Sequence, residues 1–253
     1  MRVLSDSPVR INYGIRHLVL GSVALWLFAL PLYAEDWPQW RGPTRHGLWT
    51  ETGIVDRFPD DGLQVSWRVP IRAGFAGPVV ADGRVFVLDY QENLGSRTLD
   101  GAERLVCLDE ETGGVLWTSE WPATYRNIHV TFATGPRATP NVDGDRVYVV
   151  GAAGMVLCLD TQTGAVVWQV DTVEEYGATV PVFGVSTSPL VDDDRLIVLV
   201  GGSPDGLAIA FDKRNGNERW RALPLVSEAG YSAPLIYEAE GGAPTHRVAP
   251  RRR

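Results

Sequence analysis

The sequence predicts an all-β protein assembled from repeated four-stranded antiparallel units. One nine-residue motif, Asp-x-x-x-Gly-x-x-x-Trp, occurs three times, at residues 109–117, 160–168 and 212–220, so that its tryptophans are 51 and 52 positions apart. A second motif precedes each copy: a proline begins an apolar segment that an Asp-containing turn interrupts. Two hairpins in every repeat of about 40–50 residues are typical of a β-propeller blade. We therefore expect a partial β-propeller of three blades and the start of a fourth.

The nine-residue motif has the composition of a tight β-hairpin. Its aspartate can accept backbone N–H bonds inside the turn, and its glycine permits the positive φ that a short hairpin with a bulge requires. The apolar segments before the aspartate are expected to be buried strands: 105–108, 155–159 and 207–211. A two-stranded hairpin is marginally stable alone, so these units must stack on one another.

The second motif supplies the other two strands of each unit, at residues 77–88, 139–150 and 188–199. Its proline lies at a strand start, where the missing N–H costs least. The predicted units span about 74–118, 134–169 and 184–221, and the first contains a polar insertion at Gln91–Glu103. The longer connections, 119–133, 170–183 and 222–230, are where binding residues are expected in a repeat architecture.

Two incomplete units flank the three full ones, and the predicted propeller is residues 62–237. Residues 62–67 resemble a lone outer strand that ends on Trp67, of the kind that closes a ring. Residues 231–237 repeat the start of a unit. The pattern then stops, and residues 238–253 are rich in Pro and Arg. This irregular tail is either a functional basic segment or the product of a frameshift or truncation, and we favour the second interpretation.

Residues 1–34 have the features of a secretory signal peptide. Arg10, Arg16 and His17 precede an apolar run from Leu18 to Leu32, and the small residue Ala34 predicts cleavage before Glu35. An uncleaved anchor is the alternative. We expect export to the periplasm or the extracellular space, with no stable membrane span after cleavage.

Export would place Cys107 and Cys158 in an oxidising compartment, where they have the opportunity to pair. They occupy similar strand positions in neighbouring units, however, and neighbouring blades splay apart beyond the reach of a disulfide. We expect two buried free thiols.

Residues 35–61 form a predicted N-terminal arm that is unusually rich in Trp and Pro near its start. Two interpretations are open: an arm that packs across the propeller with Trp as its anchor, or an interface or ligand cap. The first is favoured because large aromatic side chains usually stabilise by burial. The chain carries a net charge of −8, which argues against a nucleic-acid partner.

Few residues have a pattern that points to chemistry. Asp192, Asp193 and Asp194 resemble calcium ligands but fall where the other units have a turn. Arg137 precedes an inner strand and is expected near the central funnel. It is a weak candidate for cofactor binding, because it suits either an anion or a structural role with loop carbonyls. No catalytic residue and no metal ligand are predicted.

The triplicated hairpins resemble the repeat of PQQ-like (quinoprotein-like) propellers, a family that includes quinoprotein alcohol dehydrogenases and an outer-membrane assembly scaffold. The Trp37-Pro38-Gln39-Trp40-Arg41-Gly42-Pro43 segment and residues 135–140 look like a secreted branch of it. The resemblance implies a seven- or eight-bladed ring of which this chain is a fragment. It also implies that each outer-strand tryptophan docks on the adjacent blade with a turn glycine: Gly113, Trp117, Gly164, Trp168, Gly216 and Trp220.

Three hypotheses for function remain at this stage. The first is an exported, non-catalytic binding or scaffold propeller without a cofactor, in which a protein partner or self-association covers the open blade edges. The second is a fragment of a dehydrogenase that depends on pyrroloquinoline quinone (PQQ) and calcium. The chain lacks the Cys-Cys dipeptide that the resemblance leads one to expect of such an enzyme. The third is a degraded or misread gene.

Overall fold

The computed structural model describes residues 34–130, 134–202, 206–223 and 229–236, within the compact unit that begins at Ala34. The predicted signal sequence up to Tyr33 and the predicted tail lie outside the described residues. Tyr237, the last residue of the predicted propeller, lies outside them as well.

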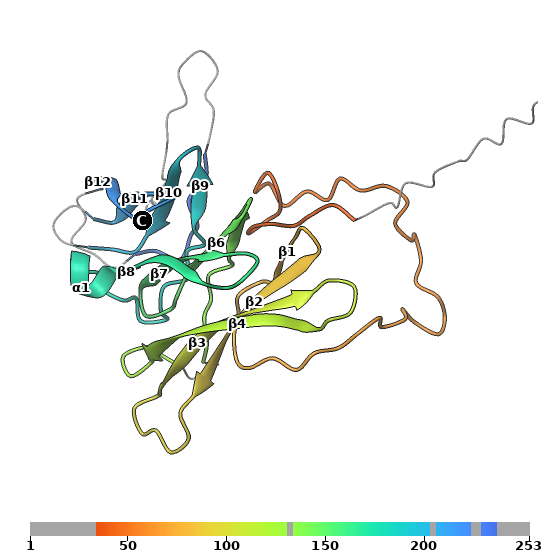
Figure 1. The fold of residues 1–253 in the computed structure, drawn as a ribbon, viewed down its shortest axis with the longest axis horizontal. Coiled ribbons are helices and arrows are strands. Elements are labelled where there is room, and N and C mark those ends of the chain that lie inside the picture. The colour runs from red at the N-terminus through yellow and green to blue at the C-terminus, as the bar shows by residue number, and fades with distance from the viewer. Residues whose placement is uncertain (1–33, 131–133, 203–205, 224–228, 237–253) are drawn as a thin grey trace, which may run out of the picture. The chain divides into compact units, whose positions relative to one another are not determined.

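The described residues form three four-stranded antiparallel sheets, and in each the strand order follows the chain (Figure 1). The first sheet contains β1 (Val79–Ala81), β2 (Arg84–Glu92), β3 (Asp100–Asp109) and β4 (Val115–Thr124). The second contains β5 (Asn141–Asp143), β6 (Arg146–Val150), β7 (Met155–Asp160) and β8 (Val166–Asp171). The third contains β9 (Leu190–Asp192), β10 (Arg195–Leu199), β11 (Ala208–Asp212) and β12 (Glu218–Ala222). The predicted partial propeller with three full blades is confirmed.

The first blade is longer than the sequence pattern suggested. Both ends of the supposed polar insertion, Gln91–Glu103, belong to strands β2 and β3, which pair as far as Glu92 and Gly101. The prediction of an insertion over this whole range was wrong. Tyr90 and Glu103 face each other in this extension, and both are buried. This segment is therefore part of the packed sheet despite its polar composition.

One element is absent from the all-β prediction. The connection after β8 contains a short helix, α1 (Thr172–Tyr176). The Asp171 side chain caps it by accepting from the backbone N–H groups of Val173 and Glu174, and Gly177 ends it with a φ of 61°. The two flanking partial units also differ from expectation, because neither residues 62–67 nor residues 231–236 are assigned as strand.

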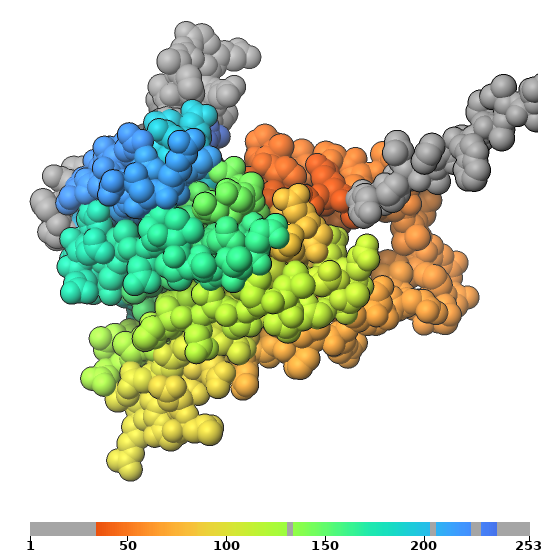
Figure 2. Space-filling view, viewed as in Figure 1, coloured from red at the N-terminus to blue at the C-terminus, as the bar shows by residue number. Residues whose placement is uncertain are grey.

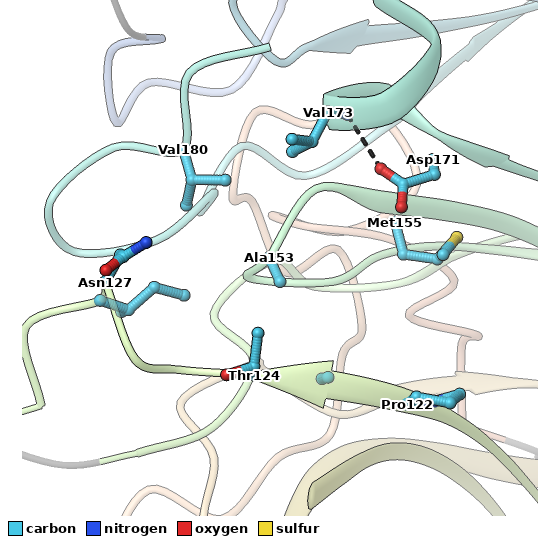
Figure 3. A pocket seen from close by; sticks show the side chains of 10 residues that line it. Pro122, Thr124, Asn127, Ala153, Met155, Asp171, Val173 and Val180 are labelled. Atoms are coloured by element: carbon cyan, nitrogen blue, oxygen red, sulfur yellow. Dashed lines mark hydrogen bonds between the residues drawn. The ribbon is translucent and has the colours of Figure 1, made fainter. Parts of the chain in front are cut away.

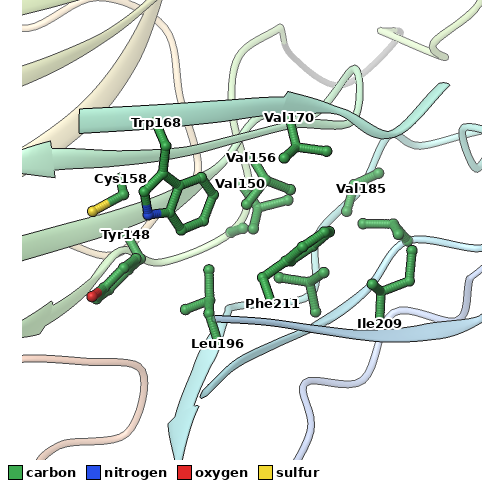
Figure 4. Close-up of a cluster of buried hydrophobic side chains, with 13 residues drawn as sticks. Tyr148, Val150, Val156, Cys158, Trp168, Val170, Val185, Leu196, Ile209 and Phe211 are labelled. Atoms are coloured by element: carbon green, nitrogen blue, oxygen red, sulfur yellow. The ribbon is translucent and has the colours of Figure 1, made fainter. Parts of the chain in front are cut away.

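The core lies between the blades. One cluster combines Phe86, Leu105 and Cys107 of the first blade with Val147 and Leu159 of the second. The next combines Tyr148, Cys158 and Trp168 of the second blade with Leu196 and Phe211 of the third (Figure 4). The first strands of consecutive blades are also neighbours, since β1 contacts β5 and β5 contacts β9. This is the arrangement of propeller blades around an axis, with their first strands innermost.

Candidate functional site

The turn motif provides the contacts between consecutive blades. The Trp117 indole at the end of the first hairpin donates from Nε1 to the carbonyl of Thr161, in the turn of the second blade, at 3.0 Å. Its ring lies over Gly164 of that turn, where an added Cβ would be 2.5 Å from the ring. Because Gly164 also has a φ of 70°, the position favours glycine on both counts. The tryptophan therefore requires a bare backbone on the next blade.

The same two contacts recur twice. Trp168 donates to the Lys213 carbonyl at 3.1 Å and covers Gly216, and Trp67 donates to the Glu110 carbonyl at 2.8 Å and covers Gly113. Residues 62–67 thus lack strand geometry, yet their tryptophan occupies the position that an outer strand of a preceding blade would give it.

Trp220 is the exception among the motif tryptophans. It packs against Leu190, Ile197 and Ala210 of its own blade. Among the described residues, its Nε1 has no hydrogen-bond acceptor and its ring covers no glycine. Within the described residues, Trp220 is therefore the docking element of the repeat with no glycine turn against it.

The aspartate of each motif organises its own turn. Asp109 accepts from both the backbone N–H and the hydroxyl of Thr112, and Asp160 accepts in the same way from Thr163. These hydrogen bonds hold the pKa of both carboxyls below the usual range. Asp193 has a φ of 52° in the turn between β9 and β10, so the triple aspartate forms a turn.

The weak candidate Arg137 lies beside a buried carboxyl. It donates to the Gly135 carbonyl at 2.7 Å, and its guanidinium lies over the Phe75 ring. Burial lowers the pKa of Arg137, while the nearby Tyr125 and Glu103 oppose that shift. Its charge therefore interacts electrostatically with an acidic group within the protein.

Glu103 and Asp89 are the two carboxyls with no exposed surface among the described residues, and Glu103 is the one that joins two blades. It has no exposed surface and accepts from Tyr125 Oη at 2.5 Å, Trp121 Nε1 at 3.0 Å and the Ala152 backbone N–H at 2.8 Å. Ala152 belongs to the second blade, so this carboxyl links two blades. Desolvation raises the pKa of Glu103 despite its three donors. Sequence reasoning missed this residue because it had assigned Glu103 to a surface insertion.

The two cysteines are buried and unpaired, as predicted. On the neighbouring strands, Cys107 lies opposite Phe86 and Trp117, and Cys158 lies opposite Tyr148 and Trp168. Burial raises the pKa of the two thiols to about 11 and about 12, respectively.

The N-terminal arm crosses the innermost strands. Trp37 exchanges two backbone hydrogen bonds with Val80 of β1, and the Pro38 carbonyl accepts from Val142 of β5. Arg45 reaches the start of β9, where it donates to the Pro189 carbonyl at 2.8 Å. The arm therefore contacts all three blades, and its red-orange atoms lie against the green segments in Figure 2. The sequence alone did not single out Arg45 as a candidate site residue, although its position beside the Trp- and Pro-rich segment could have indicated that it is buried.

A cavity of about 310 Å³ opens between the end of β4 and the second blade (Figure 3). Its walls are mostly small or apolar and include Pro122, Ala153, Met155, Val173 and Val180. Asp171 also lines it, but this carboxylate already caps α1. No cluster of metal-ligating side chains is found in the described parts of the chain, and no helix there is long and apolar enough to cross a membrane.

The blades and their tryptophan–glycine contacts define the chain as a PQQ-like β-propeller protein. A family model described as outer membrane protein assembly factor BamB matches residues 101–238, more than half of the chain, and the chain belongs to this family. The resemblance inferred from the repeats is confirmed. No curated protein matches the chain.

Three solved structures are similar to this chain over part of their own length. Quinohemoprotein alcohol dehydrogenase from Comamonas testosteroni is 22% identical with a TM-score of 0.52, over 74% of this chain and 27% of that one. BamB from Moraxella catarrhalis is 20% identical with a TM-score of 0.39, over 67% of this chain and 55% of that one. A quinohemoprotein alcohol dehydrogenase from Pseudomonas putida HK5 is 21% identical with a TM-score of 0.40, over 62% of this chain and 21% of that one. The chain thus spans little more than half of the BamB chain and about a quarter of each dehydrogenase.

Proposed function

We propose that this protein is an exported, non-catalytic scaffold that binds another protein through the outer face of its third blade. The observation that carries the proposal is Trp220. Every other tryptophan of the series lies on the glycine of a following hairpin and donates to its turn. Trp220 is the same element at the end of the described series, so a hairpin turn with a bare glycine is the partner it suits.

Two further features support a scaffold. The family is described by the name of an assembly factor. In addition, the enclosed carboxyl of Glu103 uses both oxygens to accept from protein donors. A general base must reach a proton on its substrate, so Glu103 serves the contact between two blades instead of catalysis. A second copy of the chain is the other partner that could cover the same face of the third blade. The net negative charge of the chain argues against nucleic acid as the partner.

Export is part of the proposal. The charged and apolar pattern of residues 1–34 is that of a signal peptide, and cleavage before Glu35 would leave the arm as the new N-terminus. N-terminal sequencing of protein recovered from the cell envelope tests this. A mature chain that still begins at Met1 would contradict cleavage.

The binding proposal is tested by quantitative co-purification from envelope extracts with the full chain as bait. We expect a discrete partner, or a second copy of the chain, that is retained by the parent and lost with Trp220→Ala. Trp49→Ala is the matched control, because Trp49 is 63% exposed and outside the blades. Equal retention by both variants would refute a binding role for Trp220.

The alternative is a fragment of a PQQ-dependent alcohol dehydrogenase, and the position of Arg137 beside Phe75 is the observation that favours it. The surrounding residues do not fit the group well. Arg137 donates to the Gly135 carbonyl and interacts electrostatically with Glu103, whose oxygens accept from Tyr125, Trp121 and Ala152. The negative charge of Glu103 would repel a quinone that carries carboxylates. Because both oxygens of Glu103 already accept hydrogen bonds from the protein, this carboxyl is also not available as a calcium ligand.

The two functions are separated by one assay. The purified full chain is incubated with PQQ and calcium, filtered, and mixed with alcohols and an artificial electron acceptor. The scaffold proposal expects no retained quinone and no reduction of the acceptor. Retention of the quinone with alcohol-dependent reduction that Arg137→Ala abolishes would establish the dehydrogenase instead.

A further inference from the structure

The N-terminal arm carries a buried cation, Arg45, that is paired with no acid of the described residues. Arg45 is 4% exposed and is the one arginine among the buried side chains of the described residues. Its guanidinium donates to three uncharged oxygens: Pro189 O at 2.8 Å, Ser188 O at 3.3 Å and Gln39 Oε1 at 3.2 Å. Its Nε is buried and has no acceptor in the described part of the chain. A buried charge is normally paired, so this arrangement is unusual.

The charge of Arg45 persists at neutral pH. Burial lowers the pKa of this guanidinium to about 10, and burial is the sole cause of the shift, without a contribution from any carboxylate. The backbone is also held in a costly conformation, because Arg45 has a φ of 58°. A left-handed conformation is unfavourable at a residue other than glycine. Such strain is found mainly where a side chain must be held in a specific place.

Arg45 lines a cavity of about 390 Å³, within the size range of small-molecule sites. One side of it is formed by the arm, and the other is aliphatic. The lining residues are Gln39, Pro43, Thr44, Arg45, His46, Leu190, Val191, Leu235 and Ile236. A single buried cation against an aliphatic wall matches a ligand with one negative charge and an apolar body.

We propose that this cavity binds a small monocarboxylic acid with a branched aliphatic group. To hold the carboxylate, the Arg45 guanidinium would shift toward the cavity and exchange its 3.3 Å bond to Ser188 O for the ligand, and Nε, which is buried without an acceptor, would become the second donor. A carboxylate matches the planar guanidinium, which can donate two parallel hydrogen bonds to its two oxygens. The aliphatic group would lie against Leu190 and Leu235.

A phosphate fits less well. A dianion would need more than one buried cation, and no other described arginine is buried. The aliphatic wall also offers it no donors. The proposal is independent of Trp220 and of the scaffold function, since the cavity lies on the arm side of β9.

The test is calorimetric titration of the full chain with N-acetylleucine, and with N-acetylleucinamide as a neutral probe of nearly the same shape. We expect saturable binding of the acid that is at least about tenfold tighter than binding of the amide, the usual weight of a charge-assisted hydrogen bond. Arg45→Gln should remove this preference. Arg57→Gln is the control, since it changes the net charge equally at an exposed site.

Arg45 also donates to Ser188 and Pro189, just before β9, so Arg45→Gln is complemented by a variant that leaves these bonds intact. Leu235→Asp places a carboxylate in the cavity and should weaken binding of the acid at least about tenfold, whereas Leu235→Asn should weaken it much less. Trp220→Ala should bind the acid as the parent does. Equal affinity for acid and amide, equal affinity of the two Leu235 variants, or no saturable binding by the parent up to about 10 mM would each overturn the proposal.

Discussion

Trp168→Ala is the substitution that best probes how the blades are joined. The Trp168 side chain is 8% exposed and lies between Tyr148 of its own blade and Phe211 of the next. It covers Gly216, and its Nε1 donates to Lys213 at 3.1 Å. The change removes the ring from the interface and leaves the carbonyl without its donor.

Truncation of a buried tryptophan costs about 3–5 kcal/mol of unfolding free energy. With a urea m-value of about 2 kcal/mol/M, the midpoint should fall by about 1.5–2.5 M. In repeat architectures, stability is carried by contacts between neighbours. We therefore also expect the amides of β11 and β12 to lose hydrogen-exchange protection before those of β2 and β3.

The assay is urea unfolding followed by far-ultraviolet circular dichroism, which does not depend on the fluorescence of the replaced residue. Trp49→Ala is the control, because Trp49 is exposed outside the blades and its loss removes a stacking contact with Trp37, which should change stability by no more than about 1.5 kcal/mol. A Trp168→Ala protein as stable as the Trp49→Ala protein would refute the structural role assigned to the motif tryptophans.

Three further predictions concern the turns and the buried titratable groups. Gly164→Ala should cost about 2–4 kcal/mol in urea unfolding, because a Cβ would meet an indole, whereas Gly83→Ala, with a similar φ but open space, should cost about 1–2 kcal/mol. The folded pKa of Glu103 is raised, so its contribution favours folding below the ordinary pKa of 4.5 and is lost as pH rises through the folded value. Unfolding measured across that range should therefore show the parent losing stability relative to Glu103→Gln as pH rises; parallel pH profiles would contradict this. Cys107 and Cys158, with thiol pKa values raised to about 11 and about 12, should react with a thiol reagent at pH 8 only after unfolding, and rapid labelling of the native chain would contradict their burial.

The repeats predicted most of the fold because their signals are local. The aspartate, glycine and tryptophan of each hairpin perform their functions within one turn and its nearest neighbour, so a fixed spacing is sufficient to find them. The extension of β2 and β3 was missed for a physical reason. Glu103 appears polar in sequence but is buried, because Tyr125, Trp121 and Ala152 bring donors to it from other segments.

The candidate sites depend on contacts that sequence spacing does not encode. Arg45 lies 144 positions from Pro189, to which it donates, and nothing in the repeat pattern connects the two residues. Arg137 was singled out because it departs from the repeat, yet its contact with Gly135 is local and its acidic neighbour is far away in sequence. Docking rules between blades can thus be predicted from a repeat, whereas the environment of a side chain outside the repeat cannot.

The measurement that tests the scaffold proposal most directly is photo-crosslinking in the cell from position 220. A photoreactive phenylalanine derivative replaces Trp220 in the full chain, and the same residue replaces Trp49 as the control. The proposal predicts a discrete protein adduct from position 220 alone, with the crosslinked peptide in a hairpin turn of the partner or of a second copy. No adduct, or the same adducts from both positions, would contradict it.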